Sequence, residues 1–206
     1  MQQAPIDFVT PADSVLASAG AVGIGHGPMA RELPVPYLSQ TVTNWCWATC
    51  ATMLSRYCKS SSLKICEAAS LLIGNTCCKG APQEGTFDPT WTYGSCNRTC
   101  SVAEVVELHG KIGLSSTHQG SAVSFDTLKN EIIANRAIEV AYSWTGGGGH
   151  VAIAYGFNST TSSVNVNDPW PDTGQIVVPF DQLASAYGKG SWFDTWTGIS
   201  TAGGTV

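Results

Sequence analysis

Charged side chains are scarce in this sequence. They make up 12% of the 206 residues, whereas hydrophobic residues make up 43%. The charged share is roughly half of the usual one. This balance excludes a disordered chain, because there is ample apolar material to form a core. Basic residues are fewer still, 10 against 15 acidic residues, and the formal net charge of -5 argues against a surface built for nucleic acid.

Long hydrophobic runs are also missing. No segment contains eighteen consecutive apolar residues, so we expect a soluble protein with no membrane association. The mildly apolar stretch 15–24 is too short to span a bilayer, and no basic segment precedes it. We interpret residues 1–32 as a flexible N-terminal arm or residual leader and residues 33–206 as one domain.

Cysteine, in contrast, is frequent. The chain has 8 cysteines, which is many for its size. They indicate a protein of an oxidising compartment, a metal site, or a reactive thiol among structural ones.

The hydrophobic pattern predicts helices in the first half of the chain and strands in the second. Helical spacing covers 46–57, 63–72, 101–110 and 125–134, with Thr43 or Asn44 as the cap of the first helix and a Ser101–Glu104 capping box on the third. Alternating or β-branched segments cover 137–142, 151–155, 163–166, 175–180 and 192–196. The order indicates an α+β fold with a helical lobe followed by an antiparallel β lobe.

Cys46 is the candidate nucleophile. It lies in the first turn of a predicted helix, where unpaired N–H groups and the helix dipole stabilise a thiolate. Gln40 lies six positions earlier and carries an amide that could donate a hydrogen bond to an oxyanion. Cys50 follows one turn later on the apolar face, where a thiol stays neutral.

Two features of the β half supply partners for this thiol. Four glycines, 146–149, precede His150 at the start of a strand and would let a substrate backbone approach the imidazole. Asp168 ends the next strand, so neighbouring antiparallel strands would let its carboxylate orient His150.

This arrangement resembles the papain-like cysteine peptidases. The motifs are Gln40, Asn44-Trp45-Cys46-Trp47, Gly149-His150 and Asn167-Asp168-Pro169-Trp170, in an order and spacing similar to the short bacterial family that includes plant-pathogen effector proteases. The Gly-Ser that precedes the nucleophile in plant enzymes is replaced by Asn44-Trp45, so plant substrate preferences do not transfer. We expect no papain-type prodomain in the segment before residue 33, because roughly thirty small residues are too few to form one.

The resemblance implies a Cys46–His150–Asp168 triad with Gln40 in the oxyanion hole. It also implies an N-terminal helical lobe that carries the nucleophile helix and a C-terminal antiparallel β lobe. Trp47 directly follows the nucleophile, and Trp170 is expected to shield the His150–Asp168 hydrogen bond from water. No cofactor and no metal are implied.

The remaining cysteines divide into one bystander and six candidates for disulfides. We expect Cys50 to be unpaired and up to three bridges to form among Cys58, Cys66, Cys77, Cys78, Cys96 and Cys100, with the neighbours Cys77 and Cys78 bonded to different partners. The alternative is a zinc site built from the last four. The histidines at positions 26, 109 and 118 have no companions at catalytic spacing and are expected on the surface or in helices.

The sequence therefore predicts a secreted or periplasmic, monomeric cysteine endopeptidase that acts on protein or peptide substrates through a thioester. The alternatives are a papain-fold amidase, deamidase or acyltransferase acting on protein or cell-wall peptide, and a noncatalytic secreted binding protein.

Overall fold

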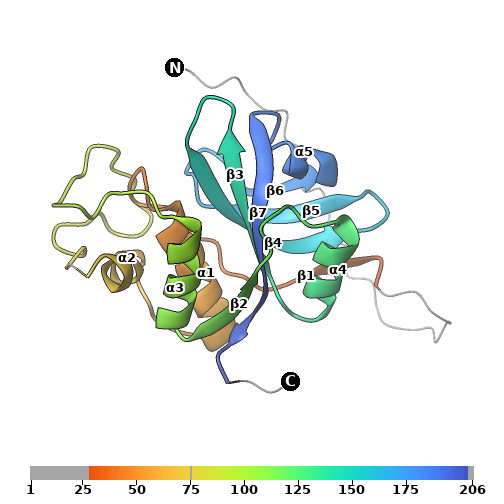
Figure 1. Ribbon diagram of the computed structural model, residues 1–206, viewed down its shortest axis with the longest axis horizontal. Helices are drawn as coiled ribbons and strands as arrows, with labels where there is room; N and C mark the ends of the chain where they lie inside the picture. Colours follow the sequence, from red (N-terminus) through yellow and green to blue (C-terminus); the bar gives the residue numbers. More distant parts are fainter. Residues whose placement is uncertain (1–27, 75, 204–206) are drawn as a thin grey trace.

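A computed structural model describes residues 28–74 and 76–203 as an antiparallel sheet with helices at one end and along its faces. Helices α1 (Cys46–Lys59), α2 (Ile65–Ile73) and α3 (Val102–Lys111) lie beside the sheet together with the cysteine-rich loop, residues 77–100 (Figure 1). Helices α4 (Phe125–Ile133) and α5 (Phe180–Ala184) pack on the sheet itself. The predicted α+β fold with a helical lobe and a β lobe is confirmed.

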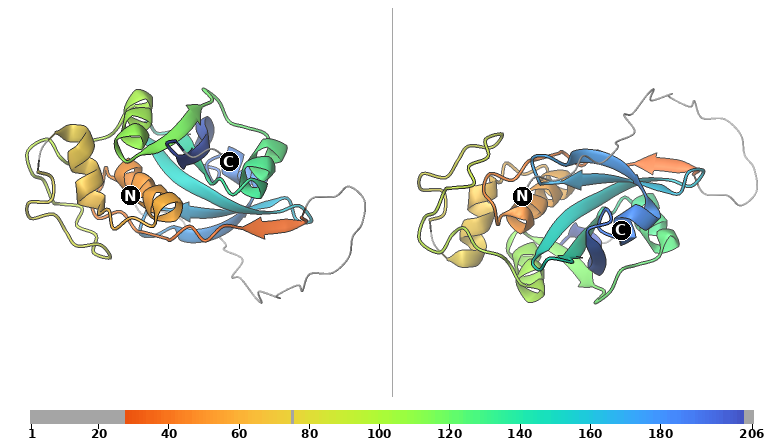
Figure 2. Two further views of the ribbon diagram at one scale, coloured as in Figure 1. Left: turned by 90° about the horizontal axis from the view of Figure 1, so that it is seen from below. Right: turned by 90° about the horizontal axis from the view of Figure 1, so that it is seen from above.

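The sheet of the described chain runs in the order β2-β7-β3-β4-β5-β6, and every pair is antiparallel. Its strands are β2 (Leu114–His118), β3 (Ile138–Trp144), β4 (Gly149–Asn158), β5 (Ser163–Asp168), β6 (Gly174–Pro179) and β7 (Gly190–Thr201). Strand β1 (Ala30–Glu32) pairs with the far end of β4, at the sheet edge seen in Figure 2. β3 and β4 are therefore the two central strands, and β4 is buried along nearly its whole length.

Helix α1 is the core of the helical lobe. The pattern predicts one apolar stripe, but all nine residues from 47 to 55 are buried, because α2, α3 and β4 surround the helix. Its polar residues are satisfied internally: Thr49 Oγ1 donates to the Trp45 carbonyl at 2.8 Å and Thr52 Oγ1 to the Ala48 carbonyl at 2.7 Å. Because both threonine hydroxyls donate to carbonyls of the preceding turn, they can be buried together with the apolar residues of the helix.

Several helix boundaries follow local signals. Ser101 and Glu104 form the predicted capping box of α3, and Gly74 ends α2 in the left-handed conformation with φ 75°. The predicted cap of α1 is wrong. The N-cap residue is Trp45, with no side-chain bond, because Thr43 and Asn44 are engaged with Asn97 instead.

Three short elements were not predicted. β1 and β2 are mostly polar segments without alternation, and α5 has five residues, too few for a helical period to show. β1 also lies before the predicted domain boundary at residue 33. The predicted arm over residues 1–27 lies outside the described residues. No helix within the described ranges combines the length and the apolar character needed to cross a bilayer.

Candidate active site

Cys46 is the first residue of α1, so its thiol lies where the helix presents unpaired N–H groups. The two flanking tryptophans fix this end of the helix. The Trp45 indole donates to the Cys96 carbonyl at 2.7 Å, and the Trp47 indole donates to the Arg98 carbonyl at 3.1 Å. One turn later, Cys50 Sγ lies 3.5 Å from the Val151 carbonyl, which holds α1 against β4 next to His150.

His150 and Asp168 come from the neighbouring strands β4 and β5. Nε2 of His150 lies 2.7 Å from Oδ1 of Asp168, and both side chains are nearly inaccessible, with exposed fractions of 8% and 1% for the two residues. The ring orientation that places Nε2 on the carboxylate leaves Nδ1 as the nitrogen for another partner. The predicted His–Asp contact is present.

The electrostatics of this pair favour an imidazolium. Burial by itself lowers the pKa of His150, but the charge of Asp168, the hydrogen bond to it, and the hydrogen bond and charge of Cys46 together raise the pKa to about 10. His150 therefore remains protonated at neutral pH. This cation shares the cleft with Cys46, the candidate nucleophile.

Aromatic rings enclose the imidazole. Tyr142 and Trp144 of β3 both stack near His150, with ring centroids 6.3 and 5.8 Å away and interplanar angles of 22° and 24°. The Trp170 backbone N–H donates to Asp168 Oδ1 at 2.9 Å, while its ring packs edge-on against Phe87. Water is excluded from most of the His–Asp contact, which strengthens the charge interaction.

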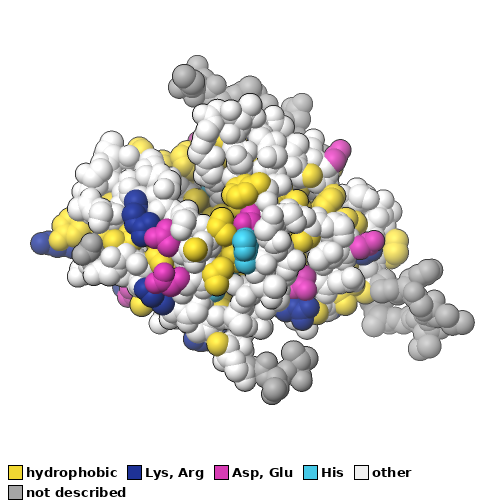
Figure 3. Space-filling view, in the orientation of Figure 1, with side chains coloured by type: hydrophobic (Ala, Val, Ile, Leu, Met, Phe, Trp, Pro, Cys, Tyr) yellow, Lys and Arg dark blue, Asp and Glu magenta, His cyan; other side chains and the backbone are white. Residues whose placement is uncertain are grey.

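These residues lie in a cleft of about 780 Å³ between the helical lobe and the sheet. Cys46, Trp47, His150, Asp168 and Trp170 line it, together with the glycine turn before His150. Figure 3 shows that apolar side chains gather in the middle of one face, between the helices and the sheet, with charged side chains mainly around them.

The family can now be assigned. The family model Peptidase_C70, described as papain-like cysteine protease AvrRpt2, matches residues 29–183. The chain belongs to this family. It is thus a papain-like cysteine protease, and the resemblance inferred from the motifs is confirmed. No curated protein sequence matches the chain.

Solved structures of cysteine peptidases share the fold. The peptidase domain of Streptococcus ComA, a bi-functional ABC transporter, is 13% identical, with a TM-score of 0.57 over 80% of this chain and 98% of that one. Xylellain, a cysteine protease from Xylella fastidiosa, is 12% identical, with a TM-score of 0.53 over 84% and 86%. A double glycine motif protease from an AMS/PCAT transporter, solved with its leader peptide, is 13% identical, with a TM-score of 0.52 over 83% and 94%.

Gln40 occupies an unexpected environment for an oxyanion donor. Its side chain is buried, and Nε2 lies 2.9 Å from the Val42 carbonyl and 3.0 Å from the Thr43 carbonyl. Oε1 is buried with no hydrogen-bond partner, and Gln40 does not line the cleft. Both recorded hydrogen bonds of the Gln40 amide are therefore to the segment just before α1, and in this arrangement the amide does not face the cleft.

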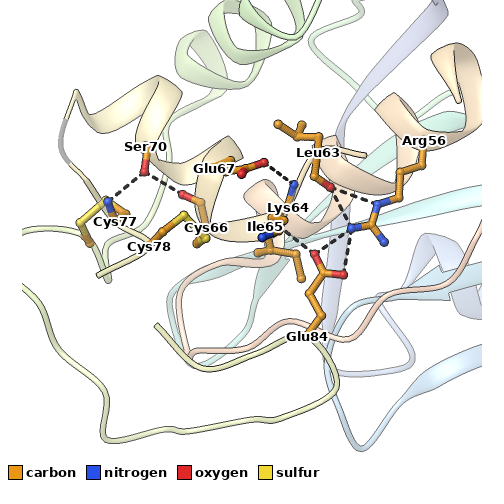
Figure 4. The surroundings of a disulfide bond; sticks show 11 residues. Arg56, Leu63, Lys64, Ile65, Cys66, Glu67, Ser70, Cys77, Cys78 and Glu84 are labelled. Atoms are coloured by element: carbon orange, nitrogen blue, oxygen red, sulfur yellow. Dashed lines mark hydrogen bonds and ion pairs between the residues drawn. A yellow bond between two sulfur atoms is a disulfide. The ribbon is translucent and has the colours of Figure 1, made fainter. Parts of the chain in front are cut away.

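The cysteines form two disulfides rather than three. The bonded pairs are Cys66–Cys78 and Cys77–Cys96, so the neighbours Cys77 and Cys78 do have different partners. In Figure 4, Ser70 ties the two bridges together: it donates to the Cys66 carbonyl and accepts from the Cys77 N–H, both at 2.8 Å. The alternative zinc site is wrong, because three of its four thiols are in disulfides.

Cys58 and Cys100, predicted to be in bridges, are free, as are Cys46 and Cys50. Cys58 lies twelve residues after Cys46 on α1, roughly 18 Å along the helix axis. Cys100 lines the cleft at the other end of that helix, so the two thiols cannot meet. Burial raises the pKa of Cys50, of Cys100 and of Cys58, the last to about 11, which keeps these thiols protonated at neutral pH.

Of the two other described histidines, His109 lies in a helix and His118 on the surface, as predicted, and each has an acidic partner. His109 is buried in α3, with Nε2 3.0 Å from Glu139, and His118 lies 2.6 Å from Asp194. Neither histidine lines the cleft. His26 lies outside the described residues.

Asp168 has a further polar contact that no motif in the sequence indicates. The Tyr187 hydroxyl donates to Asp168 Oδ2 at 3.2 Å and in turn lies 3.2 Å from the Tyr142 hydroxyl. Tyr187 stands 19 residues after Asp168, with α5 between them, so no local motif joins the two.

Proposed function

We propose that this protease is an endopeptidase that uses Cys46, His150 and Asp168. The observation that carries the proposal is the buried 2.7 Å contact between His150 and Asp168, in one cleft with a cysteine at a helix N-terminus. This arrangement combines an activated nucleophile, an acid–base group and an orienting carboxylate, which are the three parts that acyl transfer needs.

In the proposed reaction, the Cys46 thiolate attacks the carbonyl carbon of the scissile peptide bond. The Cys46 backbone N–H holds the oxyanion, and the Gln40 amide adds a second donor once it turns away from the Val42 and Thr43 carbonyls. Each such donor typically lowers the barrier by about 3 kcal/mol. The His150 imidazolium gives its proton to the leaving amine as the C–N bond breaks, which leaves a thioester on Cys46. His150 then takes a proton from water, and the resulting hydroxide displaces the thiolate and releases the acid product.

The proposed substrate is an extended peptide segment. The turn before His150 supports this, because Gly147 and Gly148 have φ of 88° and 86° and no side chains stand between the imidazole and a bound chain. The structural neighbour that was solved with a leader peptide supports a peptide substrate as well. A monomer that binds neither nucleic acid nor membrane stays a prediction.

We also propose that the enzyme works in an oxidising compartment, as a secreted or periplasmic protein. The two disulfides of the helical lobe support this location, because such bonds persist where thiols are not kept reduced.

Replacement of the nucleophile tests the reaction. Cys46→Ala is expected to abolish cleavage of denatured casein and covalent labelling by an epoxide inhibitor, with an unchanged unfolding transition. Cys100→Ser is the matched control, because it removes the other thiol of the same cleft and should keep cleavage. Cleavage by Cys46→Ala at the wild-type rate would refute the assignment. A one-dalton gain on a peptide without new termini would instead identify a deamidase.

A further inference from the structure

Both oxygens of the Asp168 carboxylate are used, and they have different partners. Oδ1 accepts from His150 Nε2 at 2.7 Å and from the Trp170 N–H at 2.9 Å, while Oδ2 accepts from the Tyr187 hydroxyl at 3.2 Å. Asp168 is almost fully buried, so no solvent could replace a lost donor at little cost. Tyr187 is therefore the side chain that holds the second oxygen.

The direction of the hydrogen bonds follows from the carboxylate. An ionised carboxylate only accepts, so the single hydroxyl proton of Tyr187 goes to Asp168. The hydroxyl of Tyr142 must then donate to the Tyr187 oxygen. Burial raises the pKa of both tyrosines well above the ordinary value, so both remain protonated donors. The chain runs from Tyr142 through Tyr187 and Asp168 to His150.

The backbone at Tyr187 is unusual. Ala186 and Tyr187 both have left-handed conformations, with φ of 47° and 59°, which side chains with a Cβ adopt at a cost of about 1–2 kcal/mol each. Such a turn persists only when its surroundings fix it. Here the Tyr187 N–H donates to the Gln182 carbonyl at 2.8 Å, and Thr145, beside the glycine turn, donates to the Lys189 carbonyl at 2.9 Å.

We propose that Tyr187 is a positioning residue of the triad, which fixes the Asp168 carboxylate and through it the plane of the His150 ring. The inference rests on the proposed triad mechanism. The strained turn after α5 places the phenol on Oδ2, the oxygen that the Trp170 N–H does not contact, and this second anchor restrains rotation of the carboxylate away from the imidazole.

Loss of the phenol oxygen has two consequences for catalysis. The unpaired Oδ2 leaves the carboxylate free to rotate, so His150 spends less time in the geometry that proton transfer to the leaving group needs. The environment of the His150 Nε2 proton changes as well, because its acceptor is no longer fixed. Tyr187 also lines the cleft, but a phenylalanine there keeps the ring, and the lost hydroxyl is the one that donates to Asp168, so substrate binding should change little.

The test compares Tyr187→Phe with Tyr57→Phe. Tyr57 is a control that loses a hydroxyl bonded only to the Asn135 carbonyl, on the far end of α1. We expect Tyr187→Phe to lower kcat about 10- to 100-fold, the range that corresponds to one hydrogen bond to a charged group. KM should stay within about twofold. The proton resonance of the His150 Nε2–H should shift and exchange faster with water.

The proposal requires both the fall in kcat and the shift of the His150 resonance. A fall in kcat with an unchanged resonance would show that Tyr187 has only a structural role. A shifted resonance with the wild-type kcat would show that the position of the imidazole does not limit the reaction. If Tyr187→Phe does not fold, Tyr142→Phe removes the donor to Tyr187, and kcat should fall about two- to fivefold with the same direction of shift. No change in Tyr142→Phe would then refute the inference.

Asp168→Asn separates this inference from the proposed function. If Asp168→Asn is as active as the wild type, the triad itself is wrong. If Asp168→Asn is impaired while Tyr187→Phe is not, the triad stands and only the role of Tyr187 fails.

Discussion

Asp168 of β5 lies on the same face of the sheet as His150 of β4. The reason is a bulge in β4: one extra residue, Tyr155, lies between His150 and the hairpin turn that joins β4 to β5. Near the turn, Phe157 pairs with Val164 and Gly156 with Asn165, but beyond Tyr155 the register shifts, and Ala154 pairs with Val166. Continuing this register places Asp168 opposite Ala152, two residues from His150 and on the same face. Without the bulge, Asp168 would stand opposite Ile153, on the other face.

Gly156, at the bulge, is the residue most sensitive to substitution there. A Cβ on Gly156 would lie 2.9 Å from Asn165 Cγ and 3.0 Å from the Arg31 carbonyl. We expect Gly156→Ala to lower the free energy of unfolding by about 1–3 kcal/mol and to reduce kcat, because the register beyond the bulge changes. Urea unfolding and casein cleavage measure both effects. Gly110→Ala in α3 is the control, because nothing lies within 4 Å of its Cβ. Wild-type stability of Gly156→Ala would contradict the prediction.

The pH profile of kcat/KM should have a late alkaline limb. The pKa of His150 is raised to about 10, so the imidazolium that protonates the leaving group persists until the pH approaches that value and is lost above it. The charge of Asp168 is the largest of the effects that raise the pKa of His150, so Asp168→Asn should lower this pKa and move the alkaline limb to lower pH. The measurement is kcat/KM from pH 5 to about 11 in both proteins. An alkaline limb near the ordinary histidine pKa of about 6.5 in the wild type would contradict the prediction, because it would show that Asp168 does not raise the pKa of His150.

Gln40 can be tested by a reaction that has no oxyanion. Gln40→Ala should lower kcat for peptide cleavage about 10²- to 10³-fold. The rate at which iodoacetamide alkylates Cys46 should be unchanged, because displacement of iodide develops no oxyanion. If both rates fall together, Gln40 instead maintains the segment before α1 through its bonds to the Val42 and Thr43 carbonyls.

The number of disulfides can be measured by mass spectrometry, and their contribution to stability by unfolding in urea. The oxidised chain should be four hydrogen masses lighter than the reduced chain, two for each of Cys66–Cys78 and Cys77–Cys96, and a loss of six would restore the three-bridge prediction. Replacing Cys77 and Cys96 together by serine opens a loop with a sequence separation of 19 and should cost about 3 kcal/mol of unfolding free energy. Cys58→Ser, a free cysteine, is the control in the same urea titration.

Much of the architecture could be predicted, because strong local signals coincide with the elements. The capping box at Ser101 and the glycine at the end of α2 are signals within four residues, and the structure uses both. β2 was missed because an edge strand of Leu-Ser-Ser-Thr-His has only one buried side chain and no alternation to detect. The cap of α1 was assigned wrongly because Asn97, more than fifty residues away, competes for Asn44.

The amino-acid sequence by itself determined the candidates for the chemistry: a thiol at a helix start, a histidine after four glycines, and an aspartate at the end of the next strand. These depend on residue type and short spacing, which a single chain displays directly. Only the tertiary structure decided which groups meet. The bulge in β4 sets the face of Asp168, the turn after α5 places Tyr187 on its second oxygen, and packing of the cysteine-rich loop selects two disulfides. Each of these contacts joins distant segments, and its energy depends on burial and register that no local pattern encodes.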